Sequence, residues 1–264
     1  MDERHHENIH DRAALYKSAF ESANDAIIYY HYDPKDEDGP RILHVNQKFV
    51  TETGYELEEA RGRHSSILFG AQTNLRMIEA NRGKLYAGEP VVSEMRKYRK
   101  NGDAYWCEAS VYPLKDTFGR YSFWISVERN ISARRELEDH LRLLKLALES
   151  AADGVVINVA NDGISAPWNI TYCNAAFERM TGWDRHELDT LEKILGPNPD
   201  REQSERARTA ILAGETVRVR TAFFRKDGAE FWVEGIVQPV LGEDELPMHS
   251  VTIYREIAKP LSAG

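Results

Sequence analysis

Hydrophobic residues recur with two different periods along the chain, which indicates a mixture of helices and strands. Residues 8–22 predict an amphipathic helix, because their apolar side chains recur at helical spacing: Ile9, Leu15, Ala19 and Phe20. Residues 26–32 are rich in β-branched and aromatic side chains and predict a strand. Residues 41–45 predict a second strand after a loop of turn-forming residues. The chain therefore begins with a helix and a two-stranded hairpin.

A short helix, a longer helix and three strands are predicted next. Asn46 stands where the N-cap of the short helix is expected, and Gly54 stands at its C-terminal end. Residues 72–87 predict the longer helix. Turns that contain glycine separate the three strands, which are expected at 91–99, 104–112 and 121–129. We therefore expect an α/β (α+β) fold, with helices on one face of an antiparallel sheet and a pocket between them.

This order of elements occurs twice, because the sequence repeats itself once. Residues 16–28 match residues 144–156 at a shift of 128 positions, and residues 88–113 match residues 214–239 at a shift of 126. A repeat of about 125 residues has the size of a complete domain and exceeds that of a solenoid unit. We predict an N-terminal helix, a first domain, a connecting helix and a second domain at 1–22, 23–132, 133–150 and 151–258.

The predicted connecting helix carries a hydrophobic seam. Residues 133–150 contain neither glycine nor proline, and four leucines recur there at coiled-coil spacing: Leu137, Leu141, Leu144 and Leu148. One interpretation is a helix that packs on its own domain. The other, which we favour, is a continuous connecting helix whose leucines form the seam of a homodimer.

Composition limits the partners and the compartment. The net charge of −9 argues against nucleic-acid binding, which requires a basic surface. No apolar run approaches the roughly 20 residues of a membrane span, so no membrane partner is expected. The two cysteines, Cys107 and Cys173, lie at unrelated positions of the two copies and do not indicate a disulfide framework. We expect a cytoplasmic protein.

Two motifs occur in the same order in both copies. Residues 46–54 and 174–182 read Asn-x-x-Phe-x-x-x-Thr-Gly, and residues 99–106 and 225–232 read Arg-Lys-x-Gly-x-x-x-Trp. These motifs resemble the signatures of PAS domains, and the resemblance covers nearly the whole chain as a tandem. It implies two PAS-like domains, each a five-stranded antiparallel sheet with helices on one face. It also implies signal transduction and an output domain, such as a histidine kinase or a cyclic-dinucleotide enzyme.

The resemblance also implies relay residues where the last strand of each domain ends. PAS domains carry an Asp-Ile-Thr-like sequence there, whose carboxylate ties the strand to the outgoing helix. The corresponding residues here are Asn130 and Ser132 in the first copy and Glu256 in the second. Asparagine forms hydrogen bonds but no ion pair, so the resemblance implies weaker or differently tuned coupling at the first exit.

Residues 62–73 resemble the flavin-binding LOV branch of the PAS family. Ser65, which follows His64, stands at the position of the photoreactive thiol of that branch. The amides that contact the flavin ring there correspond to Lys97, Cys107 and Glu128. Serine supplies no thiolate, lysine only donates and a carboxylate only accepts, so cysteinyl–flavin photochemistry is not expected. Neither haem nor another metal is expected, a site without cofactor is favoured, and flavin remains a less favoured alternative.

The candidate pocket of the first domain therefore consists of His64, Ser65, Lys97, Cys107 and Glu128. Lys97 and Glu128 are expected either to pair with each other or to bind an anionic or zwitterionic small molecule. The simplest interpretation is an internal ion pair, or a surface-exposed face of the sheet, with nothing bound. At the matching positions the second copy has apolar and bulky residues, which predict a filled core and a relay role: Phe223, Val233 and Tyr254.

We find no acid–base pair, nucleophile or phosphate-binding loop, so no catalytic residue is predicted and the chain is not expected to be an enzyme. The sequence favours a signal-sensing and dimerisation module that relays a small-molecule or partner signal to an output domain or a partner kinase or cyclase. One alternative is a flavin-binding redox or light sensor without cysteinyl adduct chemistry. A second alternative is a ligand-free dimerisation scaffold.

Overall fold

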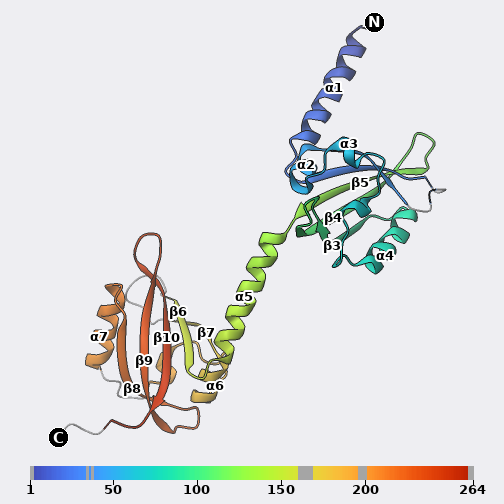
Figure 1. The fold of residues 1–264 in the computed structure, drawn as a ribbon. Helices are drawn as coiled ribbons and strands as arrows, with labels where there is room; N and C mark the ends of the chain where they lie inside the picture. Colours follow the sequence, from blue (N-terminus) through green and yellow to red (C-terminus); the bar gives the residue numbers. More distant parts are fainter. Residues whose placement is uncertain (1–2, 34–35, 37–38, 160–168, 196–200, 261–264) are drawn as a thin grey trace. The chain divides into compact units, whose positions relative to one another are not determined.

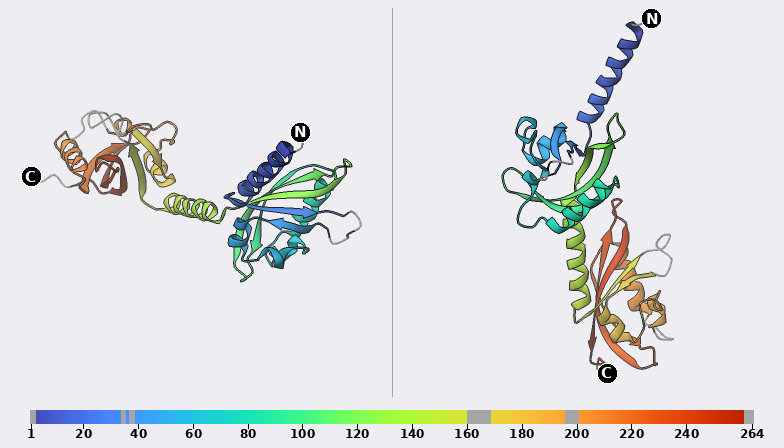
Figure 2. Two further views of the ribbon diagram at one scale, coloured as in Figure 1. Left: turned by 90° about the horizontal axis from the view of Figure 1, so that it is seen from above. Right: turned by 90° about the vertical axis from the view of Figure 1, so that its right-hand side faces the viewer.

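A computed structural model describes residues 3–33, 36, 39–159, 169–195 and 201–260. Contacts within the chain divide it into two units, Met1–Asp139 and His140–Gly264. Each unit contains one five-stranded antiparallel sheet with helices on one face (Figures 1 and 2). The predicted fold class, two α/β domains of this kind, is therefore confirmed.

The sheet of the first unit has the strand order β2-β1-β5-β4-β3. Its elements are α1 (Glu3–Glu21), β1 (Ala26–His31), β2 (Arg41–Val45), α2 (Gln47–Thr53), α3 (Leu57–Ala60), the 3₁₀-helix η1 (Ser65–Leu68), α4 (Leu75–Tyr86), β3 (Val91–Tyr98), β4 (Ala104–Lys115) and β5 (Tyr121–Asn130). The α4 helix begins three residues later than the sequence predicts. Asn74 caps its first turn by accepting a hydrogen bond from the Met77 N–H at 3.1 Å.

The sheet of the second unit has the corresponding order β7-β6-β10-β9-β8. Its elements are β6 (Gly154–Val159), β7 (Asn169–Cys173), α6 (Ala175–Thr181), the 3₁₀-helix η2 (Leu191–Lys193), α7 (Arg201–Leu212), β8 (Val217–Phe224), β9 (Glu230–Leu241) and β10 (Pro247–Ile257). Helix α5 (Ser132–Ser150) precedes them, and its residues are divided between the two units.

The asparagine of the Asn-x-x-Phe motif connects several segments of each domain by hydrogen bonds. Asn46 is fully buried, and its Oδ1 accepts hydrogen bonds from the N–H groups of Phe49 (3.1 Å) and Ile27 (2.9 Å). Its Nδ2 donates to the carbonyl oxygens of Phe20 at 3.1 Å and Asp25 at 3.0 Å. The predicted N-cap therefore also ties the end of α1 to strand β1. Asn174 makes the corresponding four bonds in the second domain.

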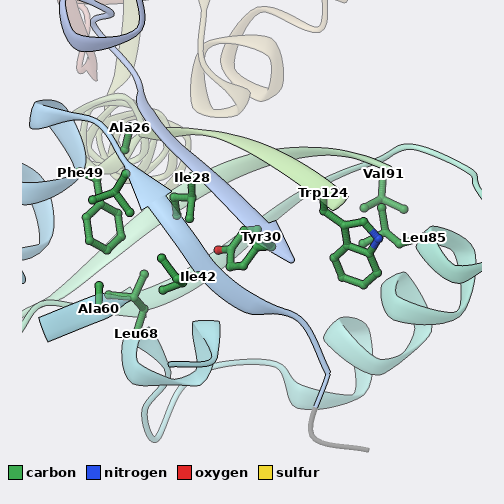
Figure 3. Packing of buried hydrophobic residues seen from close by; sticks show 11 residues of the cluster. Ala26, Ile28, Tyr30, Ile42, Phe49, Ala60, Leu68, Leu85, Val91 and Trp124 are labelled. Carbon is green, nitrogen blue, oxygen red and sulfur yellow. The ribbon is translucent and has the colours of Figure 1, made fainter. Parts of the chain in front are cut away.

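The core of each domain lies between the sheet and the helices that cover it. In the first domain, Trp124 packs near Leu85 and Val91, and Tyr30 points into the same layer (Figure 3). The Trp124 ring also lies 5.6 Å from the ring of Tyr32, centre to centre. In the second domain the largest buried side chains include Phe177, Leu188 and Phe223. Aromatic rings thus form a large part of the core in both domains.

Candidate functional site

Three of the predicted site residues meet inside the first domain. Lys97 on β3, Cys107 on β4 and Glu128 on β5 all point to the inner face of the sheet, and all three are buried. The Nζ of Lys97 lies 2.6 Å from Oε1 of Glu128. The Ser126 hydroxyl donates to the same oxygen at 2.9 Å, and the Cys107 thiol donates to the other carboxylate oxygen at 3.8 Å. The cluster is thus an internally hydrogen-bonded ion pair.

The electrostatics of this cluster favour the charged pair and a neutral thiol. Burial alone would lower the pKa of the Lys97 ammonium, but attraction to the Glu128 carboxylate outweighs it and raises that pKa. Burial, and then the same carboxylate, raises the pKa of the Cys107 thiol and of the Tyr105 phenol. Cys107 therefore remains protonated at neutral pH and lacks the thiolate that nucleophilic or redox chemistry requires.

Ser65 and His64 occupy different places relative to this cluster. Ser65 begins η1 and lines a cavity of about 80 Å³ together with Lys97 and Glu128. His64 precedes η1, where its backbone forms an isolated antiparallel bridge with Arg41, and it is not among the residues that line the cavity. The structure therefore brings Ser65, Lys97, Cys107 and Glu128 to one region and leaves His64 at its edge.

The cavity of the first domain does not fit a flavin. Pockets for drug-sized ligands occupy roughly 300–1,000 Å³, whereas this cavity measures about 80 Å³. The polar groups that would face the ring, Lys97 and Glu128, are engaged with each other at 2.6 Å. An ammonium and a carboxylate also cannot both donate and accept as an amide does.

Asn130 and Ser132 hold the exit of β5 together with Glu52 and Arg99, for which the sequence predicts no such role. Asn130 donates from Nδ2 to Oε1 of Glu52 at 2.6 Å, and the Arg99 guanidinium donates to the same oxygen at 2.5 Å. Asn130 also accepts from the Ser132 N–H at 2.9 Å, and the Ser132 hydroxyl accepts from the Trp106 N–H at 2.9 Å. Asn130 and Ser132 thus connect strand β5 to the start of α5, and their role in a relay stays a prediction. The missing carboxylate comes from Glu52 on α2.

The second domain makes the corresponding contact with its carboxylate on a different element. Arg225, which matches Arg99, donates to both carboxylate oxygens of Glu256 at 2.8 and 3.0 Å. It also donates to the carbonyl oxygen of Met180, the residue that matches Glu52. The carboxylate therefore lies on the exit strand in one domain and on the short helix in the other. An arginine binds the carboxylate in both domains, and the two exits differ in which element carries the carboxylate.

Helix α5 exposes the predicted seam. Leu137, Leu141 and Leu144 are each more than half exposed, Leu148 is half-buried, and no described residue of the helix is buried. The interpretation in which these leucines pack on their own domain is therefore wrong. The dimer interpretation remains a prediction.

The second domain contradicts the prediction of a filled core. A cavity of about 450 Å³ lies between α7 and the sheet, and Phe223 and Tyr254 are among the residues that line it. Val233 is fully buried away from the cavity. The predicted bulky residues are present, but the space beside them is open. Two smaller residues, Asn158 and Ser250, also line this space.

In the described part of the chain, no group of three or more His, Cys, Asp or Glu side chains is arranged to hold a metal ion. None of the described helices is both long and apolar enough to cross a membrane.

Curated relatives include proteins named blue-light-activated histidine kinase. The protein from Brucella anthropi is 24% identical over 226 residues, which are 80% of this chain and 45% of the relative. The protein from Brucella canis is 25% identical over 242 residues, which are 86% of this chain and 48% of the relative. The chain thus spans slightly less than half the length of these relatives.

Two solved structures are similar to parts of the chain. One, described as "Flavin Analogue Sheds Light on Light-Oxygen-Voltage Domain Mechanism", is 27% identical with a TM-score of 0.40, covering 49% of this chain and 96% of its own. The other is the LOV domain of a blue-light activated histidine kinase from Erythrobacter litoralis. It is 20% identical with a TM-score of 0.38, covering 42% of this chain and 98% of its own.

Two protein-family models match most of the chain. A model described as PAS domain matches residues 24–133, and a second model with the same description matches residues 142–213. Together the two matches span well over half of the 264 residues. The chain belongs to the PAS-domain family and carries two of its domains in tandem.

Proposed function

We propose that this chain is the non-enzymatic sensory and relay region of a signalling protein. In this proposal the first domain receives a signal, α5 carries it to the second domain, and an output domain such as a histidine kinase responds. The relatives named as histidine kinases support a linked kinase. They also support a sensory role, because their names record activation by a signal.

The observation that carries the proposal is the attachment of α5 at both of its ends. Its first residues are bound to the strands of the first domain by Asn130 and Ser132, and by ion pairs from Arg134 and Arg135 to Glu94. Its last turn is bound to the second domain. There the Leu148 carbonyl accepts from Nδ2 of Asn174 at 2.8 Å.

The adjacent Glu149 strengthens the attachment at the second domain. Its carboxylate accepts from the Ala175 N–H at 2.9 Å, the Tyr172 hydroxyl at 3.1 Å and the Arg185 guanidinium at 3.1 Å. Hydrogen bonds to an ionised group are stronger than neutral ones. A change of strand β5 therefore has a bonded route into α5, and a change of α5 has one into α6.

The names of the relatives and the geometry of the first domain favour different classes of signal. The relatives' names favour light over a diffusible small molecule, and they do not support the preference for a first domain without cofactor. Against a flavin stand the cavity of about 80 Å³ and the Lys97–Glu128 pair. We propose that the first domain receives its signal without a cysteinyl–flavin adduct, since Ser65 supplies no thiolate.

A light or redox sensor that holds flavin without an adduct is the second candidate function. The blue-light relatives are the observation that favours it. The absorption band of oxidised flavin in the purified chain would support this candidate.

The proposal includes a homodimer formed through α5. The exposed leucines at 137, 141 and 144 lie at the spacing of a two-stranded coiled coil. Burying this stripe against a second copy would remove from water the large apolar side chains that the helix exposes.

The relay is tested by weakening the exit of β5 and measuring hydrogen exchange in both domains. Glu52→Gln removes the charge that Arg99 and Asn130 share. We expect faster amide exchange at the start of α5 and also in α6, because α5 is bonded to both. Mass spectrometry of peptides from the intact chain measures both regions.

Glu59→Gln is the matched control. It breaks the exposed ion pair of Lys100 and Glu59, which contributes little, and leaves the exit of β5 unchanged. Exchange in α6 should then equal that of the unaltered chain. If Glu52→Gln changed exchange only in the first domain, the relay proposal would be wrong.

A further inference from the structure

The cavity of the second domain has the size of a small-molecule site. Its volume of about 450 Å³ lies within the range of known ligand pockets, roughly 300–1,000 Å³. The corresponding cavity of the first domain measures about 80 Å³. Two domains of one fold thus differ several-fold in internal space.

Two residue pairs explain the difference. In the first domain Tyr30 on β1 faces Trp124 on β5 in the strand register, and both rings point into the core (Figure 3). At the matching register position of the second domain, Asn158 on β6 faces Ser250 on β10. Two large aromatic rings are therefore replaced by two small polar side chains. The volume of the rings becomes open space under α7.

The wall made by these small residues is buried and incompletely hydrogen-bonded. Asn158 and Ser250 are each 2% exposed, and Thr252 is 1% exposed. Asn158 donates from Nδ2 to the Ser250 hydroxyl at 3.3 Å. Its Oδ1 accepts no hydrogen bond from any described residue. A buried carbonyl oxygen without a donor is unfavourable, so this atom requires a partner from within the cavity.

The other residues that line the cavity indicate the chemistry of the rest of the ligand. The side walls are largely apolar and include Val219, Phe223 and Val237, whereas Glu192 and Arg208 lie at the exposed rim. The deep wall carries no charged side chain, so a charged ligand group would be buried there without a counter-ion.

We propose that this cavity binds a small uncharged molecule with an apolar body and a hydrogen-bond donor directed at Oδ1 of Asn158. The site belongs to the second domain alone and does not depend on the relay through α5. Failure of the binding test below therefore leaves the relay proposal standing, and failure of the relay leaves the binding site standing.

Indole and indene test the proposal in the full chain. They have nearly the same shape, but only indole carries an N–H donor. Titration followed by NMR, through the side-chain amide of Asn158 and the backbone amides of β6 and β10, gives both affinities. Indole should bind about tenfold more tightly than indene, because only indole satisfies the buried oxygen. Equal affinities, or no binding of either probe because water alone fills the cavity, would overturn the proposal.

Three variants locate the site. Asn158→Leu should abolish the preference for indole while retaining binding of both probes, because shape is kept and the acceptor is lost. Ser250→Trp restores the aromatic ring of the first domain and should abolish binding of both. Tyr30→Phe, at the position of the first domain that matches Asn158, should change neither affinity. A folded Asn158→Leu variant that still preferred indole would refute Oδ1 of Asn158 as the acceptor. Thermal unfolding establishes whether this variant is folded.

Discussion

Replacing Lys97 by methionine would leave a carboxylate buried in the first domain without its cation. The Nζ of Lys97 lies 2.6 Å from Oε1 of Glu128, and the two side chains are 3% and 5% exposed. Only the Ser126 hydroxyl and the Cys107 thiol would still donate to that carboxylate. Removing one member of a buried ion pair costs about 3–5 kcal/mol. We expect a loss of that size in the free energy of unfolding of the first domain near pH 8.

The loss should depend on pH with a defined sign. Without the ammonium, the buried Glu128 carboxyl group is more stable when protonated, so folding of the Lys97→Met variant takes up a proton. Where the folded state binds more protons than the unfolded state, stability falls as pH rises. The penalty should therefore be smaller near pH 5 than near pH 8. Replacing both residues, Lys97→Met with Glu128→Leu, should be neutral or stabilising by about 1–4 kcal/mol.

Native-state hydrogen exchange in strands β3, β4 and β5 measures the stability of the first domain separately. Lys100→Met is the control, because it breaks an ion pair whose members are 50% and 41% exposed and should cost at most about 1 kcal/mol. A Lys97→Met penalty below about 1 kcal/mol, equal at both pH values, would refute the buried ion pair.

Three further predictions concern the connecting helix and its attachment. Leu141→Glu with Leu144→Glu should shift sedimentation from dimer to monomer, because charges replace the exposed seam; an unchanged sedimentation coefficient would argue against it. Asn174→Ala should cost more than about 2 kcal/mol in thermal unfolding of the second domain, because a buried side chain loses four hydrogen bonds; a cost below about 0.5 kcal/mol would contradict this. The hydrogen bond from the Ala175 N–H, and next the Arg185 guanidinium, lower the pKa of Glu149. The stability that the Glu149 carboxylate contributes is therefore complete above its unfolded pKa of about 4.3, and it is lost as pH falls through its folded pKa. The protection factor of the Ala175 amide, corrected for the intrinsic exchange rate at each pH, should then fall on acidification in the unaltered chain but not in Glu149→Gln.

Features set by neighbouring residues could be predicted from the sequence. The side chain of Asn46 caps the helix that follows it, and Gly54 ends that helix with φ of +76°. Strands β1 to β5 begin and end within about three residues of their predicted bounds, because alternation and glycine turns are local signals. Burial of Lys97, Cys107 and Glu128 on one face followed from the same alternation.

The open cavity of the second domain depends on residues far apart in the sequence. Asn158 and Ser250 are separated by 92 positions and meet only through the register of β6 and β10. Phe223, Val233 and Tyr254 are bulky, and from them the sequence predicts a filled core. Extending the repeat alignment to Tyr30 and Trp124 would have revealed two large-to-small replacements.

The role of Glu52 could not be read from a motif. It lies within the short helix α2 at a variable position of the first repeated pattern, and its partners Arg99 and Asn130 come from two other segments. Only the three-dimensional placement of α2 beside the exit of β5 brings the three side chains together.

The absorption spectrum of the purified chain, equilibrated with flavin mononucleotide and recorded in the dark and under blue light, shows whether the first domain binds a flavin. The ion pair of Lys97 and Glu128 predicts no bound flavin, and it predicts no light-induced loss of a flavin band in Ser65→Cys either. A flavin that stays bound to the unaltered chain, with a band that Ser65→Cys makes sensitive to light, would contradict it.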